Sequence, residues 1–514
     1  MVSHDLWPRR FLERREKKKP DLPARVFWPE TIDEVVRIIR AAIQENIAVV
    51  PFGAGSGVCA GIAVKPQTWV LDTKRMDQLL EINQAEMTCT VEAGMIGERL
   101  ERALNAQGYS LGHFPSSIYC STVGGWVATR SAGQLSSRYG KIEDLVLGVE
   151  AVDGSGAILN ASYDDPQTGP AALRLLIGSE AALCVFTKIT FRIHRPTEFR
   201  WLRGYQFKNL DCALEGMQFI LKSGVTPSVL RLYDPLDTFL AGVPDSDELT
   251  PHAPERGSIS LAGLEYSGPN AGRHEPGVLD ALTEHLQRMF LFAKPDQTQR
   301  VVGNLLSRPL MVNMALNKLA GGTKLIIGLE GDAGELEHRI KHADICLTKT
   351  GGTDVGERVG QKWLKNRHRV SYRMSHVFAA GGWADTMEVA TGWDQVLPLY
   401  EEVCHALRDV AIVMCHFSHA YIDGCSLYFT FSGGGGRGQG KRSSLQRYDL
   451  AWQRALAVVK KFDAALSHHH GIGRSKKNAI QLSAPSLDYL LTLKKIFDPH
   501  GILNPGVLGL GDEP

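Results

Sequence analysis

The chain has 514 residues, of which 44% are hydrophobic, and its 57 basic side chains nearly balance 56 acidic ones. This length and apolar content allow two or three domains around at least one large core. A net charge near zero gives no reason to expect nucleic acid as a partner, and no apolar run reaches the roughly 18 residues that span a bilayer. The N-terminus also lacks the apolar segment of a secretory signal, so we expect a cytoplasmic protein.

The nine cysteines are scattered singly between Cys59 and Cys425, and none forms a Cys-x-x-Cys pair. This pattern favours reduced, mostly buried thiols over a disulfide framework or a zinc site. We therefore expect no bound metal.

A basic arm precedes the first predicted element. Residues 9–19 hold seven basic and two acidic side chains, with Trp7, Phe11 and Leu12 beside them. Such a segment is most often solvated, although a basic amphipathic helix on an anionic membrane surface is the alternative. We assign residues 1–24 to this arm.

The first domain begins with a predicted helix, a short strand and a glycine loop. Thr31 and Glu34 have the spacing of a capping box, and apolar residues recur at helical spacing up to residue 43. The β-rich run "IAVVPFG" follows, and the loop "GAGSG" allows a close approach of phosphate oxygens to backbone N–H groups. The loop is not a Rossmann fingerprint, because no helix follows it. On its own it indicates either a diphosphate site or an ordinary tight turn.

The second motif is more specific. The stretches "FPSSIYCSTVGGWVATRSAG", "YGKIEDLVLGVEAV", "PFGAGSGVCAG" and "IGSEAALCVFTKITFRI" together resemble the FAD-binding domain of the vanillyl-alcohol oxidase and p-cresol methylhydroxylase superfamily. The resemblance implies an α+β fold: a two-subdomain FAD-binding domain, an α+β cap domain and a C-terminal helical segment. It also implies that the following residues contact FAD: Pro51, Gly53, Ala54, Gly55, Ser56, Gly57, Pro115, Ser116, Ser121, Thr122, Gly124, Gly125, Thr129, Gly133, Ile142, Glu180 and Val185.

Two departures from that superfamily bear on the cofactor. Members often attach the flavin through a histidine in or near the first loop, and this loop has none, so we expect non-covalent FAD. The segment near the adenosine usually reads Gly-Ser-Glu-Gly-Thr-Leu-Gly, whereas this chain reads "GSEAALC" from Gly178 to Cys184.

The rest of the chain predicts helices near residues 332–349 and 393–409, a strand pattern over residues 411–431, a glycine-rich loop and a final helical stretch. We expect an FAD-binding domain over residues 25–196, a cap domain over residues 197–440 and a helical segment over residues 441–514. That last segment is expected to complete the active site and to pack on the FAD domain.

Three groups of side chains could carry chemistry. His416 and His419 lie in or beside the strand pattern, close in sequence to Tyr421 and Tyr428. The run His468, His469 and His470 supplies imidazoles that exchange protons near neutral pH. Arg231 and Arg373 offer guanidiniums suited to phosphate or carboxylate. Taken singly, a strand tyrosine is most often a core residue, a histidine beside a glycine turn is often structural, and the basic run around Arg373 could be solvated.

Together these stretches resemble one family. "HFSHAYIDGCSLYFTF", "SHHHGIGRSKK" and the closing "FDPHGILNPG" are similar to the alkyl-dihydroxyacetonephosphate synthases of ether-lipid synthesis and their bacterial relatives. The resemblance implies a redox-neutral exchange on FAD, in which a long-chain alcohol replaces the acyl group of acyl-dihydroxyacetone phosphate. It implies that Tyr428 removes the C1 proton, that His468, His469 and His470 transfer protons, and that Arg373 and Arg231 bind the substrate phosphate. It also implies a homodimer with peripheral contact to the inner face of a membrane.

The main alternative is an FAD-dependent 2-hydroxyacid dehydrogenase or oxidase of the D-lactate or glycolate type. Such enzymes typically carry a His-Gly-Asp-Gly-Asn-x-His strand and a Gly-Glu-His-Gly-Ile-Gly turn. Here these places read "HFSHAYIDG" and "SHHHGIG", so His469 replaces the usual glutamate, which disfavours a metal-assisted hydroxyacid site.

Overall fold

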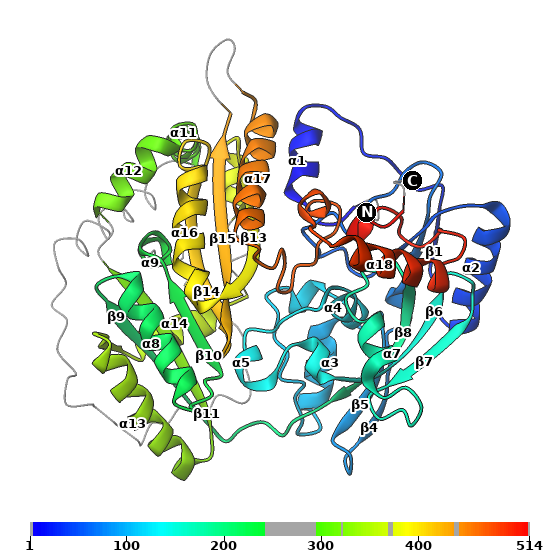
Figure 1. Ribbon diagram of the computed structural model, residues 1–514, viewed down its shortest axis with the longest axis horizontal. Coiled ribbons are helices and arrows are strands. Elements are labelled where there is room, and N and C mark those ends of the chain that lie inside the picture. The colour runs from blue at the N-terminus through cyan, green and yellow to red at the C-terminus, as the bar shows by residue number, and fades with distance from the viewer. Residues whose placement is uncertain (1–3, 242–294, 320–321, 369–373, 436–441, 512–514) are drawn as a thin grey trace. The chain divides into compact units, whose positions relative to one another are not determined.

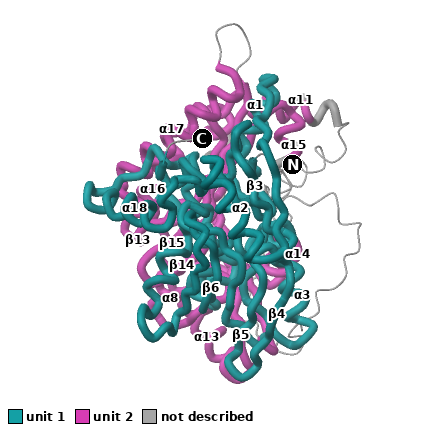
Figure 2. Tube along the Cα trace, turned by 90° about the vertical axis from the view of Figure 1, so that its right-hand side faces the viewer, with its two compact units in different colours: residues 1–196, 466–514 teal, residues 197–465 magenta. Residues whose placement is uncertain are grey.

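The computed structural model describes residues 4–241, 295–319, 322–368, 374–435 and 442–511. The chain forms two compact units, which Figure 2 distinguishes by colour: residues 1–196 with 466–514, and residues 197–465. The predicted segment 441–514 is therefore divided. Its helix α17 (Ser444–Lys461) belongs to the second unit, and residues 466–514 belong to the first.

The first unit contains two sheets (Figure 1). The parallel sheet has the order β1-β3-β2, and the antiparallel sheet has the order β4-β5-β8-β6-β7. Their strands are β1 (Arg25–Phe27), β2 (Val49–Phe52), β3 (Trp69–Asp72), β4 (Leu79–Asn83), β5 (Thr88–Glu92), β6 (Val146–Asp153), β7 (Ile158–Ser162) and β8 (Cys184–Arg192). The helices of this unit are α1 (Pro8–Arg15), α2 (Ile32–Glu45), α3 (Gly97–Asn105), α4 (Val123–Thr129), α5 (Ser136–Tyr139), α6 (Ile142–Leu145), α7 (Pro170–Leu176) and α18 (Ala484–Phe497).

Helix α2 confirms the predicted helix, and β2 confirms the strand that follows it. The Thr31 hydroxyl accepts a hydrogen bond from Glu34 N at 3.3 Å, as a capping residue does. The Glu34 carboxylate instead accepts from Glu30 N at 2.7 Å, so the predicted capping box is one-sided. On the apolar face of α2, Val35, Ile39 and Ala42 are fully buried and share a core with β2 and β3. This packing fixes the position of β2 and therefore of the start of the glycine loop that follows it.

A second core lies between the antiparallel sheet and helices α3 and α4. Trp126 of α4 is 3% exposed and packs so closely on α3 that a side chain at Gly97 would overlap its ring. The Thr122 hydroxyl accepts from Gly125 N at 3.3 Å and caps α4. Residues 115–125 are therefore held in place by a well-packed helix.

The second unit is built on one seven-stranded sheet with the order β12-β9-β11-β10-β14-β15-β13. Its strands are β9 (Phe199–Phe207), β10 (Val229–Tyr233), β11 (Thr323–Gly331), β12 (Thr353–Gly356), β13 (Gly382–Gly392), β14 (Ile412–Ala420) and β15 (Gly424–Gly434). Its helices are α8 (Leu210–Lys222), α9 (Pro235–Ala241), α11 (Pro295–Leu306), α12 (Pro309–Leu319), α13 (Ala333–Lys349), α14 (Arg358–Asn366), α15 (Met374–Ala379), α16 (Trp393–Leu407) and α17.

One face of this sheet is an apolar core. Phe417, Leu427 and Phe429 on β14 and β15 are fully buried there. The ring of Tyr400 in α16 lies 5.6 Å from that of Phe417 and 6.3 Å from that of Phe429. The core therefore fixes the register of the hairpin, because a slip of one residue would exchange its two faces.

The opposite face carries a polar row that crosses every strand at one level. Residues paired directly across neighbouring strands lie side by side on the same face. In strand order, the row consists of Thr353, Gln206, Lys324, Tyr233, His416, Tyr428 and Glu388.

The predicted helices near residues 332–349 and 393–409 are confirmed as α13 and α16. The predicted strand pattern over residues 411–431 is instead a hairpin of two strands, β14 and β15, with a turn after Ala420. The glycine-rich loop was predicted over residues 432–444, and its residues 436–441 lie outside the described part of the chain.

The N-terminal arm is folded rather than solvated over residues 4–15. His4 forms a β-bridge with Ala63, and Leu6 N donates to Gly57 O at 2.8 Å. The Asp5 carboxylate, which is 2% exposed, accepts from Gly61 N at 2.9 Å. The solvated interpretation overlooked these contacts because it weighed only the run of charges that follows.

All nine cysteines are free thiols, and six of them are buried. Among the described residues, no helix combines the length and the apolar character needed to cross a bilayer.

Candidate active site

The glycine loop after β2 offers a row of backbone donors. In the described part of the chain, no oxygen accepts a hydrogen bond from the backbone N–H groups of residues 54–58. Gly55 has a φ of +70°, a conformation that favours glycine. Lys74 stabilises the start of the loop, because its Nζ donates to Gly53 O at 2.9 Å and to the Asp72 carboxylate at 2.7 Å.

The loop and the start of α4 come together. A side chain at Gly53 would overlap the Thr122 hydroxyl, so only glycine allows this approach. Ser121 Oγ accepts from Trp126 Nε1 at 2.8 Å, and Thr129 Oγ1 donates to Gly125 O at 3.0 Å. The structure therefore places the predicted cofactor residues of the glycine loop beside those at the start of α4.

The other predicted cofactor residues have varied surroundings. Gly124 and Gly133 lie close to the backbones of Ala93 and Phe114. The side chains of Ile142 and Val185 are 0% and 2% exposed and belong to the two hydrophobic cores. Any cofactor contact from Ile142 or Val185 would therefore come from the backbone.

Glu180 has a role that the sequence did not indicate. Its carboxylate accepts from Ile472 N at 2.6 Å and from Gly473 N at 2.8 Å, which binds it to the loop after the histidine run. Its backbone is left-handed, with a φ of 48°. Burial raises the pKa of Glu180, and the two amides, Lys476 and Arg474 oppose that rise. The side chain thus holds a segment that is 292 residues away in sequence.

Further contacts fix the same loop. Arg474 donates to Ala60 O and Gly61 O, both at 3.1 Å, and to Pro505 O at 2.5 Å. Asn504 Nδ2 donates to Gly61 O at 3.0 Å and to Glu180 O at 2.8 Å. The residues that follow the glycine loop, the Glu180 segment, the histidine loop and the closing "LNPG" turn are therefore one hydrogen-bonded assembly.

The histidine run lies on this assembly as an irregular loop. His468, His469 and His470 are half-buried, and successive rings pack edge to face with centroids 5.4 and 4.6 Å apart. His468 Nδ1 and His469 Nδ1 are 3.2 Å apart. Among the described residues, no group of three or more His, Cys, Asp or Glu side chains is placed to hold a metal ion.

In the second unit, three predicted residues meet within the polar row or next to it. The rings of His416 and Tyr428 stack with centroids 4.5 Å apart and an angle of 14° between planes. Arg231 lies on β10 two residues before Tyr233 and therefore on the same face. Its guanidinium donates to His416 Nε2 at 2.7 Å. Arg231 Nε is buried without a hydrogen-bond partner among the described residues.

The contacts of His416 define its tautomer. A guanidinium has only donors, so His416 Nε2 accepts and the proton belongs on Nδ1, which faces Asp237 Oδ2 at 3.3 Å. His419 stands apart, because the ladder shifts register between Ser418 and Ala420 and its φ is 50°. Arg373 lies outside the described residues.

Tyr428 carries its proton at neutral pH in this structure. Burial raises its pKa to about 12, although a hydrogen bond with Thr386 and the charge of Arg231 act in the opposite direction. The neighbouring cation that a tyrosine base requires is present, but desolvation outweighs it.

Comparisons with known proteins agree with this architecture. The model of the FAD binding domain family matches residues 23–162, and that of the FAD linked oxidases, C-terminal domain, matches residues 198–508. An alkyldihydroxyacetonephosphate synthase of Trypanosoma brucei brucei is 26% identical over 500 residues, which cover 95% of this chain and 73% of that protein. The glycolate oxidase subunit GlcD of Bacillus subtilis (strain 168) is 29% identical over 215 residues, which cover 41% of this chain and 46% of that protein.

A solved structure of alkyldihydroxyacetonephosphate synthase has the same fold, with a TM-score of 0.70 at 22% identity over 98% of this chain and 80% of that chain. The model of the C-terminal domain family matches more than half of the residues of this chain. The chain therefore belongs to the FAD-linked oxidase family, and it is a flavoenzyme. The predicted α+β fold of the p-cresol methylhydroxylase type and the predicted FAD cofactor are confirmed.

The residues of the first unit fit a bound FAD. The amides of residues 54–58 are donors of the kind that bind a diphosphate, and no protein oxygen among the described residues competes for them. The Ser475 hydroxyl, which follows the histidine loop, is buried and also lacks a partner in the described part of the chain. The glycine loop would hold the diphosphate, and residues 115–125 would lie along the rest of the cofactor.

Several supporting residues escaped the sequence analysis: Lys74, Asp237, Arg474 and Asn504. Only Asn504 had a local signal, because an Asn-Pro-Gly sequence predicts a turn and its φ is indeed 38°. The others act through partners that are distant in sequence.

Proposed function

We propose that this chain exchanges the acyl group of acyl-dihydroxyacetone phosphate for a long-chain alcohol with no net redox change. The match to a synthase over 95% of the chain supports this activity within the FAD-linked oxidase family. The observation that carries the proposal is the cluster of Arg231, His416 and Tyr428, in which one imidazole contacts both a guanidinium suited to phosphate and a phenol suited to proton transfer.

Arg231 has the capacity to bind a phosphate group. A guanidinium has five N–H donors, and one of them is used for His416. The buried Nε has no partner among the described residues. Phosphate oxygens would pair with the remaining donors. The resulting binding energy would orient the substrate ketone for reaction at its C1 carbon. We propose that Arg373 assists Arg231.

We propose that Tyr428 receives the C1 proton after losing its own. A phenol whose pKa is about 12 is ionised in about one molecule in 10⁵ at pH 7, and forming the phenolate costs about 7 kcal/mol. The reaction is therefore expected to accelerate as pH rises. The imidazole of His416 stacks on the phenol and lies between Asp237 and Arg231. It therefore positions both the phenol and the guanidinium of Arg231.

FAD, when bound without a covalent link, supplies an electrophilic ring system that activates the carbon undergoing exchange. His468, His469 and His470 would move protons between the leaving acid and the entering alcohol. Their loop is held by Glu180 and Arg474, so the imidazoles are pre-positioned. We also propose that the protein is a cytoplasmic homodimer. We propose that it contacts the membrane peripherally, because a long-chain alcohol partitions into lipid.

A 2-hydroxyacid dehydrogenase or oxidase is the alternative. The match to a glycolate oxidase subunit favours it over part of the chain. Against it, His469 stands where such enzymes carry a glutamate, and its ring contacts two other imidazoles.

The test is an anaerobic incubation of the purified holoprotein with palmitoyl-dihydroxyacetone phosphate and hexadecanol. We expect equal amounts of alkyl-dihydroxyacetone phosphate and free palmitate without any electron acceptor. Tyr428→Phe should abolish both products, whereas Tyr489→Phe, at a side chain that is 73% exposed, should change neither. Release of palmitate without the ether product would contradict the proposal.

A further inference from the structure

The helix of the N-terminal arm ends in a way that gathers positive charge. Lys17 N donates to Arg14 O at 2.9 Å and Lys18 N donates to Glu13 O at 3.0 Å, the pair of bonds that defines a Schellman motif. Lys17 takes the left-handed position of that motif, with a φ of 63°, where glycine is the usual residue. The chain therefore reverses its direction at the end of α1.

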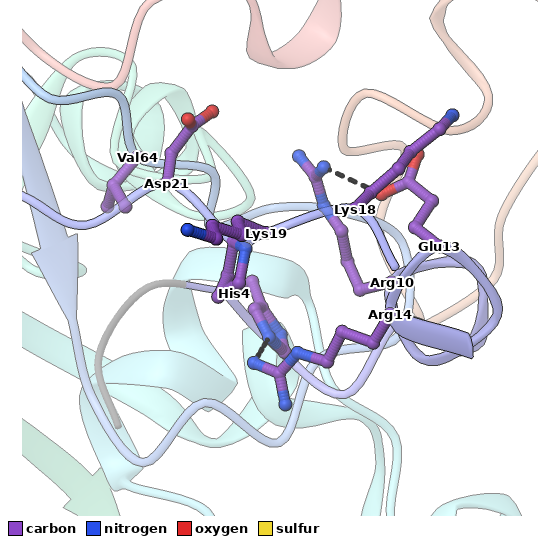
Figure 3. Close-up of a pocket in the computed structure, with 9 residues that line it drawn as sticks. His4, Arg10, Glu13, Arg14, Lys18, Lys19, Asp21 and Val64 are labelled. Carbon is purple, nitrogen blue, oxygen red and sulfur yellow. Dashed lines mark hydrogen bonds and ion pairs between the residues drawn. The ribbon is translucent and has the colours of Figure 1, made fainter. Parts of the chain in front are cut away.

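This reversal lines a small hollow with cations (Figure 3). Arg10 and Arg14 come from α1, Lys18 and Lys19 follow its end, and His4 precedes it. The hollow has a volume of about 30 Å³, and its remaining lining residues are Glu13, Pro20, Asp21 and Val64. Its size suits one small tetrahedral group rather than an extended ligand.

The charge of the hollow is positive. Four cationic side chains face two carboxylates, and the carboxylate of Glu13 is already paired with Arg9 and Arg10. His4 adds no charge, because its Nε2 accepts from Arg14 at 2.6 Å. Burial and the charges of Arg14 and Arg10 lower the pKa of His4, which agrees with a positive local potential.

The hollow is also anchored. Asp5 accepts a hydrogen bond from Gly61 N, and Leu6 N donates one to Gly57 O. His4 forms a β-bridge with Ala63. None of its lining residues belongs to the glycine loop of residues 53–57. The backbone that leads into α1 is therefore held in place, and the residues that line the hollow are separate from the proposed diphosphate contacts.

We propose that this hollow is a second anion site, which binds a phosphate group. Guanidiniums pair with phosphate oxygens through paired N–H donors, and lysine ammoniums act as point charges at short range. The phosphate group could belong to a soluble anion or to a lipid headgroup, and both present the same chemistry to these side chains.

The test titrates the full-length holoprotein with inorganic phosphate by calorimetry, and in parallel with phosphatidylglycerol and phosphatidylcholine vesicles by sedimentation, at low ionic strength. Lys18→Glu/Lys19→Glu should weaken binding at least tenfold. The control Arg15→Glu/Lys17→Glu changes the net charge equally on the same arm but outside the hollow, and it should weaken binding less than threefold.

Binding of free phosphate would identify a soluble anion. Binding to phosphatidylglycerol vesicles alone, lost in the first variant, would identify a headgroup. The proposal fails if the wild type binds neither probe, or if both variants lose affinity equally, since equal loss indicates diffuse attraction. Lys18→Ala/Lys19→Ala keeps the test valid if charge reversal disturbs α1, because it removes the cations without adding repulsion.

Discussion

Replacing Glu180 should release the histidine loop. The alanine variant leaves the amides of Ile472 and Gly473 without their acceptor, and each buried unpaired N–H costs about 1–3 kcal/mol. Burial raises the pKa of Glu180, so desolvation of the carboxylate offsets part of that cost. We expect Glu180→Ala to lower the free energy of unfolding by about 2–4 kcal/mol, and Glu180→Gln, which keeps one acceptor, by about half as much.

The assay combines denaturant unfolding with hydrogen exchange measured by mass spectrometry. Peptides that cover residues 466–476 should exchange faster in Glu180→Ala. The matched control is Glu101→Ala, which removes a carboxylate that accepts from Leu111 N at 3.0 Å in the same unit. It should reduce stability and leave exchange in the histidine loop unchanged. Unchanged exchange in Glu180→Ala, or an equal increase in Glu101→Ala, would refute the positioning role of Glu180.

Three further predictions concern the loop, the phenol and the arm. Gly53→Ala should lose bound FAD, because its side chain would overlap the Thr122 hydroxyl. The control Gly61→Ala should retain FAD, because its new carbon would meet only Asp5 Oδ2 at 4.0 Å. Equal FAD content in the two purified variants would contradict this prediction. If Tyr428 is the base, log(kcat/KM) should rise with unit slope from pH 7 to 9, because its pKa is about 12, and a plateau near pH 7 would indicate an imidazole instead. Burial raises the pKa of Asp5 from 3.8 to about 7, so its stabilising contribution is present below pH 4 and is lost as pH rises through 7. The free energy of unfolding of the wild type minus that of Asp5→Asn should accordingly fall by up to about 4 kcal/mol between pH 4 and 8, and a difference that does not change with pH would show that Asp5 does not titrate in this range.

Local patterns were sufficient for individual elements. The apolar spacing before the glycine loop predicted α2, because a helix that packs on a sheet must bury one stripe. The same reasoning found α13 and α16. It did not separate β14 from β15, since a turn at Ile422 and Asp423 interrupts a run that is β-rich on both sides.

The geometry of the site depends on pairings that spacing does not encode. Tyr428 faces His416 because of the hairpin register, and Arg231 reaches the same imidazole from a strand 185 residues earlier. Glu180 belongs to a motif that predicts FAD contact, and the motif gives no sign that its carboxylate also binds the histidine loop. Side-chain identity therefore indicates candidate residues, and only the sheet order and the loop contacts show which of them meet.

The central claim is an exchange without net redox change, and the most direct test follows the visible absorbance of the bound flavin under anaerobic conditions. We predict that palmitoyl-dihydroxyacetone phosphate changes this absorbance and that a fatty alcohol restores it with no electron acceptor present. D-lactate and glycolate should leave the oxidised spectrum unchanged. If either hydroxyacid instead fully reduces the flavin, and only an external acceptor reoxidises it, the exchange mechanism is wrong and the chain is an oxidoreductase.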